Sequence, residues 1–104
     1  MIVDVRTYTL IPRKLTKYVE IFEKHGLPVM KRHGLYLLGY YVSYIGPLNQ
    51  VVHLWRYDNL ADMEKKRAAR DADPDWGEFL SLTEGMLLVQ EDKVMRPASF
   101  SPNR

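Results

Sequence analysis

Residues 45–62, IGPLNQVVHLWRYDNLAD, decide the fold of this chain. Gly-Pro-Leu-Asn at 46–49 is typical of a tight turn, and residues 50–57 are rich in the β-branched and aromatic types that favour strands. The Asp-Asn pair at 58–59 offers a side-chain cap for a helix that begins directly afterwards. The stretch therefore predicts the second half of an antiparallel hairpin that leads straight into a helix.

The central strand of this stretch carries His53, Trp55 and Tyr57 at a spacing of two. Side chains alternate across a strand, so these three share one face. Such a face can pack as inert core, or it can hold a ligand. Both interpretations stay open from the sequence.

Hydrophobic spacing and breakers predict the remaining elements. Strands are expected over 2–10, 36–45, 50–57 and 86–95, and helices over 14–25, over 60–72 and from Pro74 to Gly85. The interruption at residues 25–28 predicts a kink or a restart of the first helix, and Gly39 predicts a bulge. The stripe expected to be buried in the last helix comprises Trp76, Phe79, Leu80 and Thr83.

This order of elements predicts an α+β, ferredoxin-like βαββαβ fold with a four-stranded antiparallel sheet. Helices then cover one face of the sheet. The strands nevertheless carry apolar or aromatic residues on both faces, for example at 40–44 and 51–55. An open face of that composition would be a large apolar patch, so we expect a second copy to cover it in a homodimer.

Composition limits the other possibilities. The 104 residues with a net charge of +2 predict one domain over 1–100 and an exposed tail over 101–104. The absence of cysteine excludes a disulfide scaffold and a thiolate metal site. No apolar run approaches the roughly 20 residues that cross a bilayer, and the N-terminus is unlike a signal peptide, so no membrane insertion is expected.

Motifs for common chemistry are also missing. The sequence holds no phosphate-binding glycine loop and no nucleophile elbow. Strand 50–57 lacks the basic-glycine-aromatic pattern of RNA-recognition motifs, so no nucleic acid is expected. The spacing of the three histidines does not suit a dedicated metal site, and no cofactor is predicted.

His53 is the best single candidate for chemistry, as a polar anchor or an acid–base group. If strand 2–10 lies beside strand 50–57, Arg6 and Tyr8 come next to it. Such a group suits a flat or a carboxylate-bearing small molecule, and we expect a small apolar or aromatic ligand. The predicted ligand-binding residues are Arg6, Tyr8, Tyr40, His53, Trp55 and Tyr57.

Three segments give the chain a resemblance to the NIPSNAP family: 6–12, 26–34 and, above all, 46–57 running into the next helix. The resemblance implies a dimeric α/β barrel of ferredoxin-like units. The short length resembles stand-alone bacterial members, which implies a cytoplasmic protein. No catalytic residues are implied by the family.

Two functions therefore compete. The first is a homodimeric ligand-binding protein without catalytic activity. The second, suggested by sister families of the same barrel, is a cofactor-independent monooxygenase or isomerase in which His53 works with Tyr8 or Tyr40. A haem-handling variant would use His25, His33 or His53 as the axial ligand.

Overall fold

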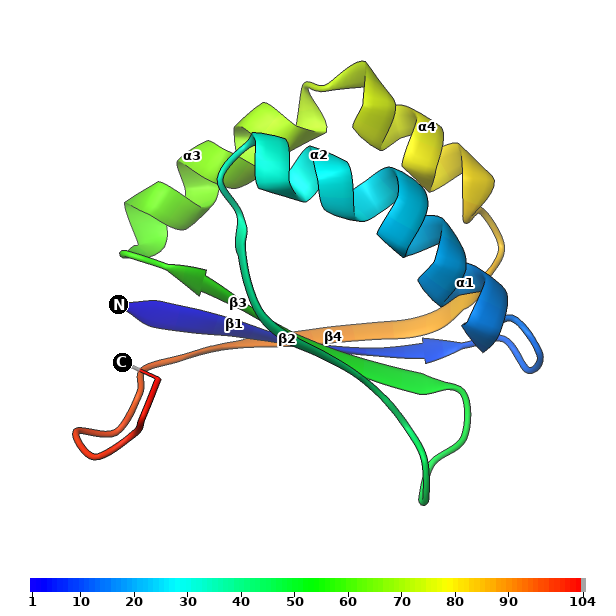
Figure 1. The fold of residues 1–104 in the computed structure, drawn as a ribbon, viewed down its shortest axis with the longest axis horizontal. Coiled ribbons are helices and arrows are strands. Elements are labelled where there is room, and N and C mark those ends of the chain that lie inside the picture. The colour runs from blue at the N-terminus through cyan, green and yellow to red at the C-terminus, as the bar shows by residue number, and fades with distance from the viewer. Residues whose placement is uncertain (104) are drawn as a thin grey trace.

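The computed structural model describes residues 1–103 and shows a single sheet covered by helices. The strands are β1 (Ile2–Leu10), β2 (Tyr36–Val42), β3 (Gln50–Tyr57) and β4 (Leu87–Met95). The helical elements are α1 (Leu15–Ile21), η1 (Phe22–Gly26), α2 (Leu27–Arg32), α3 (Leu60–Asp71) and α4 (Pro74–Leu82). The antiparallel strands follow the order β2-β3-β1-β4, and every helix lies on one face of the sheet (Figure 1). The predicted ferredoxin-like α+β fold is confirmed.

Strand register brings the candidate site residues together. β1 and β3 are neighbours at the centre of the sheet, and Arg6 pairs with His53 while Asp4 pairs with Trp55. Burial alternates along β3, where Val51, His53, Trp55 and Tyr57 are buried on the side of the helices. The spacing of two in the sequence therefore has the expected structural meaning.

β2 contains the predicted bulge but is shorter than expected. Its register shifts between Leu37 and Gly39, and the shift places Tyr40 opposite His53. The strand ends at Val42 instead of residue 45, because Gly46 and Asn49 both adopt left-handed backbone angles. Residues 44–48 consequently form an exposed loop instead of continuing the hairpin ladder.

The α-helix that begins at Leu15 is interrupted by η1, and a new α-helix starts at Leu27, which agrees with the restart expected at residues 25–28. η1 is a π-helical turn, in which the backbone N–H of Leu27 donates to the carbonyl of Phe22. Pro28 then falls in the first turn of α2. Proline is tolerated there because the N–H that it lacks would have no intrahelical partner.

Both predicted helix caps form, whereas one residue of the predicted buried stripe is exposed. Asn59 accepts a hydrogen bond from the backbone N–H of Asp62, and Asp73 accepts one from that of Asp75. Trp76, Phe79 and Thr83 of the α4 segment are buried, but Leu80 is half exposed because it lies on the flank of this short helix.

Two helical glycines should respond oppositely to alanine. A Cβ at Gly26 would lie 2.7 Å from Cδ1 of Phe22, whereas nothing lies within 4 Å of one at Gly77. We expect Gly26→Ala to lower the free energy of unfolding by about 1–3 kcal/mol through overpacking. Gly77→Ala, its matched control, should raise it by about 0.5–1 kcal/mol through helix propensity. Urea unfolding measures both, and stabilisation by both would contradict tight packing of Phe22 on Gly26.

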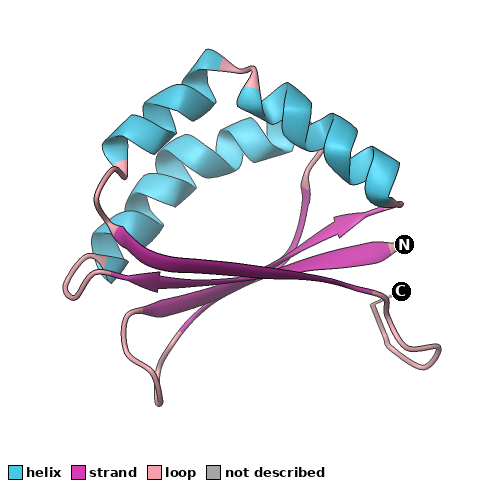
Figure 2. Cartoon of the chain, turned by 180° about the vertical axis from the view of Figure 1, so that it is seen from behind, coloured by secondary structure: helices cyan, strands magenta, loops and turns pink. Residues whose placement is uncertain are grey.

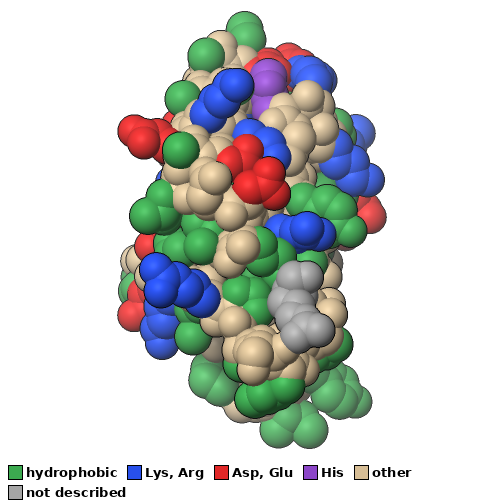
Figure 3. Space-filling model, turned by 90° about the vertical axis from the view of Figure 1, so that its left-hand side faces the viewer, with side chains coloured by type: hydrophobic (Ala, Val, Ile, Leu, Met, Phe, Trp, Pro, Cys, Tyr) green, Lys and Arg blue, Asp and Glu red, His purple; other side chains and the backbone are tan. Residues whose placement is uncertain are grey.

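The sheet face opposite the helices is not covered by any described segment of the chain except at one end (Figure 2). There, Pro97 and Ser101 of the tail border a groove with Val5 and Leu54 of the sheet. Ser101 is half buried and residues 102–103 are exposed, while Arg104 lies outside the described residues. Hydrophobic side chains gather at the lower end of the molecule, on the side of this open face (Figure 3).

None of the helices among residues 1–103 combines the length and the apolar character needed to span a membrane.

Candidate functional site

A cavity of about 60 Å³ lies between the sheet and the helices. Five of the six predicted site residues line it: Arg6, Tyr8, His53, Trp55 and Tyr57. The sixth, Tyr40, lies directly behind the cavity, because its ring stacks on that of His53 at 4.7 Å with an interplanar angle of 18°. The structure therefore brings all six residues to one place.

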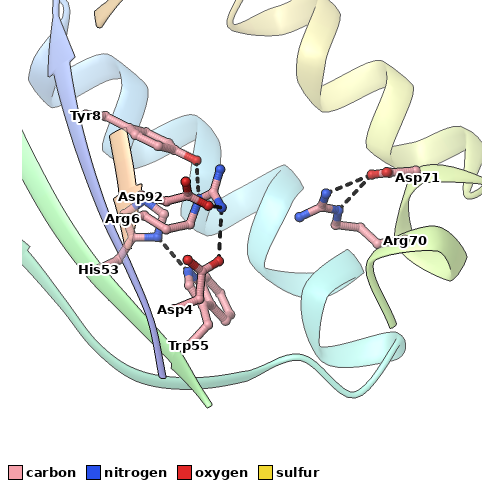
Figure 4. A network of polar contacts seen from close by, with 8 residues as sticks. All are labelled: Asp4, Arg6, Tyr8, His53, Trp55, Arg70, Asp71 and Asp92. Carbon is pink, nitrogen blue, oxygen red and sulfur yellow. Dashed lines mark hydrogen bonds and ion pairs between the residues drawn. The ribbon is translucent and has the colours of Figure 1, made fainter. Parts of the chain in front are cut away.

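His53 is held in one defined protonation state. Its side chain is buried, and the indole Nε1–H of Trp55 donates a hydrogen bond of 2.6 Å to its Nδ1 (Figure 4). Because an indole N–H can only donate, Nδ1 is an unprotonated acceptor and the ring proton resides on Nε2. Burial, assisted by the positive charge of Arg6, lowers the pKa of His53 to about 3. The ring is neutral at physiological pH and is a weak base.

A charged network of residues from β1 and β4 lies next to His53. Nη1 of Arg6 lies 3.0 Å from carboxylate oxygens of both Asp4 and Asp92, and Nε donates to the hydroxyl of Tyr8 at 2.8 Å (Figure 4). Burial lowers the pKa of Arg6, but Tyr8 and Asp4 outweigh that effect and leave the pKa above its usual value. Burial and the charge of Asp4 also raise the pKa of Tyr57 to about 12.

Sequence reasoning missed Asp4, which is only 1% exposed. An acidic residue between the apolar Val3 and Val5, two positions before Arg6 on the same face of the strand, was the available signal. Asp92 of β4 was also missed, because its pairing opposite Arg6 depends on a strand register that the sequence does not show.

Three buried side-chain polar atoms within residues 1–103 have no hydrogen-bond partner: Oδ1 of Asp4, Oη of Tyr40 and Nε2 of His53. Native proteins leave few such atoms unpaired, because each one costs about 1–3 kcal/mol. All three belong to residues that line the cavity or stack directly against it. The unpartnered polar atoms are therefore concentrated in this one part of the described chain.

Two arginines of α3, Arg67 and Arg70, also line the cavity and were not predicted. The guanidinium of Arg70 lies 4.5 Å from the centre of the Trp76 ring and is ion-paired with Asp71 at 2.8 Å. The only pattern in the sequence that could have indicated them is their spacing of three positions on a helix with few apolar residues. They add positive charge to the side of the cavity covered by α3.

The side chains around the cavity do not favour the binding of a metal ion or of haem. Residues 1–103 contain no group of three or more His, Cys, Asp or Glu side chains arranged to hold a metal ion. Ligation through Nε2 of His53 would require its proton to move to Nδ1, which the Trp55 N–H already occupies. His33 instead contacts Asp73 at 2.8 Å, and neither it nor His25 lines the cavity. The histidines therefore do not suit an axial haem ligand in this cavity.

Comparison with known proteins identifies the family of the chain. The sequence model of the NIPSNAP family matches residues 3–102. The chain belongs to the NIPSNAP family. It is 33% identical over 93 residues to human Protein NipSnap homolog 3A, covering 88% of this chain but only 37% of the human protein.

Solved structures agree with the fold of this NIPSNAP chain. Protein Atu4242 from Agrobacterium tumefaciens superposes with a TM-score of 0.94 at 39% identity, covering 98% of both chains. A putative antibiotic biosynthesis monooxygenase from Nitrosomonas europaea has a TM-score of 0.69 at 13% identity, covering 93% of this chain and 98% of the other. The second likeness concerns the fold alone.

Proposed function

We propose that this NIPSNAP chain is a homodimeric protein that binds a small apolar or aromatic molecule in the cavity beside His53. The observation that carries the proposal is the set of unpartnered buried atoms on Asp4, Tyr40 and His53. Aromatic rings provide an apolar wall, and these few polar atoms would fix the orientation of the ligand. Ligand sites commonly combine these two properties.

The open sheet face supports the homodimer. Tyr36 and Tyr41 of β2 and Met95 of β4 are 51–60% exposed although they lie in strands. Tyr41 pairs with Val52, so its side chain lies on the sheet face that His53 does not occupy and points away from the helices. A second copy, sheet against sheet, would remove this apolar surface from water through a self-complementary contact.

Native mass spectrometry of the freshly purified protein tests both parts. We expect twice the chain mass of 12.2 kDa plus a small constant excess from a captured ligand. His53→Leu should reduce or abolish the excess, because leucine has no donor, whereas His53→Gln should retain part of it, since the glutamine oxygen can accept from Trp55 and its amide NH₂ can donate to the ligand. A monomer would contradict the homodimer. A bare protein whose His53 ring resonances respond to no member of a small-molecule library would contradict ligand binding.

Catalysis is a second candidate, favoured by the neutral Nε2–H of His53 in a buried site. Such a donor can stabilise negative charge that develops on a substrate oxygen. His53 would then act as a hydrogen-bond donor, because Trp55 occupies Nδ1 and the low pKa makes the ring a weak base. In an enzyme, His53→Leu, which removes the donor, should lower turnover of an accepted substrate by about a hundredfold or more. Unchanged turnover would eliminate this role.

A further inference from the structure

The two sides of the cavity differ in charge. The sheet contributes Asp4 and His53, whereas α3 on the helical side contributes Arg67 and Arg70. The carboxylate of Asp4 is already balanced, because one of its oxygens lies 3.0 Å from Nη1 of Arg6. In Figure 4, the guanidinium of Arg70 is directed from α3 towards this network. The two arginines therefore make the α3 side of the cavity positive.

Both guanidiniums of α3 keep free donors. Arg67 is half-buried, and no carboxylate among residues 1–103 lies within ion-pair distance of it. The side chain of Arg70 is only 13% exposed, and its partner Asp71 takes Nε and Nη2. Nη1 of Arg70 is left without a partner in the described part of the chain. Guanidinium N–H groups pair most strongly with an anion such as a carboxylate.

We propose that the ligand is a small hydroxy acid with a slender hydrocarbon body. Arg67 and Arg70 hold its carboxylate, and its hydroxyl group lies beside Asp4 and His53. This inference rests on the proposed function and specifies the chemistry of the ligand.

The unpartnered atoms on the sheet favour the hydroxyl group. Nε2–H of His53 lacks an acceptor, and Oδ1 of Asp4 lacks a donor. The two residues are diagonal neighbours on paired strands, because Asp4 pairs with Trp55 and Arg6 with His53. A hydroxyl group both donates and accepts, so it matches both atoms. A carboxylate in the same place would offer Asp4 no donor and would repel its charge, which assigns the acid end to α3.

Apolar side chains line the space between these two ends. The cavity encloses about 60 Å³, which suits the hydroxyl end of a slender chain better than a bulky group. Arg67 also lines a hollow on the outer side of α3, so the acid end lies at the edge of the cavity. The apolar lining that would contact the hydrocarbon body includes Trp55, Tyr57, Trp76, Phe79 and Leu80.

The two tryptophans of the chain report on the two ends of this site. The indole N–H of Trp55 donates to His53, and the ring of Trp76 lies 4.5 Å from the guanidinium of Arg70. We expect 6-hydroxyhexanoate to shift both indole N–H resonances in a titration followed by NMR. Hexanoate lacks the hydroxyl group and 6-hydroxyhexanamide lacks the charge, so each should bind about tenfold more weakly.

A matched pair of variants locates the acid end. Arg67 lines the cavity, whereas Lys65 is an exposed cation of the same helix that does not line it. Arg67→Gln should remove a large part of the preference for 6-hydroxyhexanoate over 6-hydroxyhexanamide. Lys65→Gln makes the same change of charge and should retain the preference. Circular dichroism checks that both variants are folded.

Each contrary result has a separate meaning. Equal affinities for the acid and the amide, or equal effects of the two variants, would overturn the carboxylate site on α3. Hexanoate binding as tightly as 6-hydroxyhexanoate would overturn the hydroxyl site. No response of either indole to the three compounds would overturn the whole inference. In that case, an excess mass in the native spectrum that is lost in His53→Leu would still support ligand binding in the cavity.

Discussion

Replacing Arg6 with leucine should lower the free energy of unfolding by about 3–5 kcal/mol at pH 7. Arg6 is the cationic partner of the carboxylate of Asp4, which is buried at 1% exposure. Leucine fills part of the volume but leaves that charge in the interior without compensation. The loss should greatly exceed that of an exposed charge, because water cannot reach Asp4 to solvate it.

Urea unfolding of a matched set of variants tests this expectation. Lys17→Leu removes an exposed cation from α1 and should change stability by less than about 1 kcal/mol. Asp4→Asn combined with Arg6→Leu should recover a large part of the stability, because no buried charge remains. Equal losses in Arg6→Leu and Lys17→Leu would show that Asp4 is solvated in the folded protein.

The second large effect is a dependence of stability on pH that originates in His53. Its pKa is lowered to about 3 in the folded chain, whereas an exposed histidine has a pKa of about 6.5. Below pH 6.5, His53 binds a proton in the unfolded chain but stays neutral in the folded chain, so the free energy of unfolding falls as the pH decreases towards 3. At pH 5 the loss from this one group should be about 2 kcal/mol.

Comparison of the wild type with His53→Gln isolates this contribution. Between pH 7.5 and pH 5, the wild type should lose about 2 kcal/mol more than the variant, as measured by urea unfolding. The Asp73 carboxylate does not interfere in that window. Hydrogen bonds from His33 and the Asp75 backbone lower its pKa to about 2, so its contribution is lost only below about pH 4. Parallel pH profiles would show that His53 is charged or solvated in the fold.

The core of the site was predictable because strand periodicity is a local property. His53, Trp55 and Tyr57 alternate with polar or smaller residues, and Arg6 and Tyr8 repeat the pattern on another strand. Once the element order indicated a ferredoxin-like sheet, the neighbouring positions of these strands followed. The structure adds the hydrogen bond from Trp55 to His53, which sets the tautomer and changes the expected role of the ring from base to donor.

Other features depend on geometry that a local pattern does not contain. The π-helical turn that precedes Pro28 was not predicted, because no residue type signals such a turn reliably. The role of Asp4 depends on the position of Arg6 and on the depth of burial. The early end of β2 depends on backbone angles at Gly46 and Asn49. In each case the tertiary environment outweighs the propensity of the residue.

The central position of β1 also has a consequence for biosynthesis. This strand precedes both of its neighbours, β3 and β4, in the sequence, and Asp92 of β4 pairs with Arg6 across 86 positions. Such distant pairing slows folding, because a long segment of chain must be closed before the contact forms. While the ribosome is still making β4, the edge of β1 lacks its final neighbour. The charge network of the cavity is therefore complete only after β4 has emerged and paired with β1.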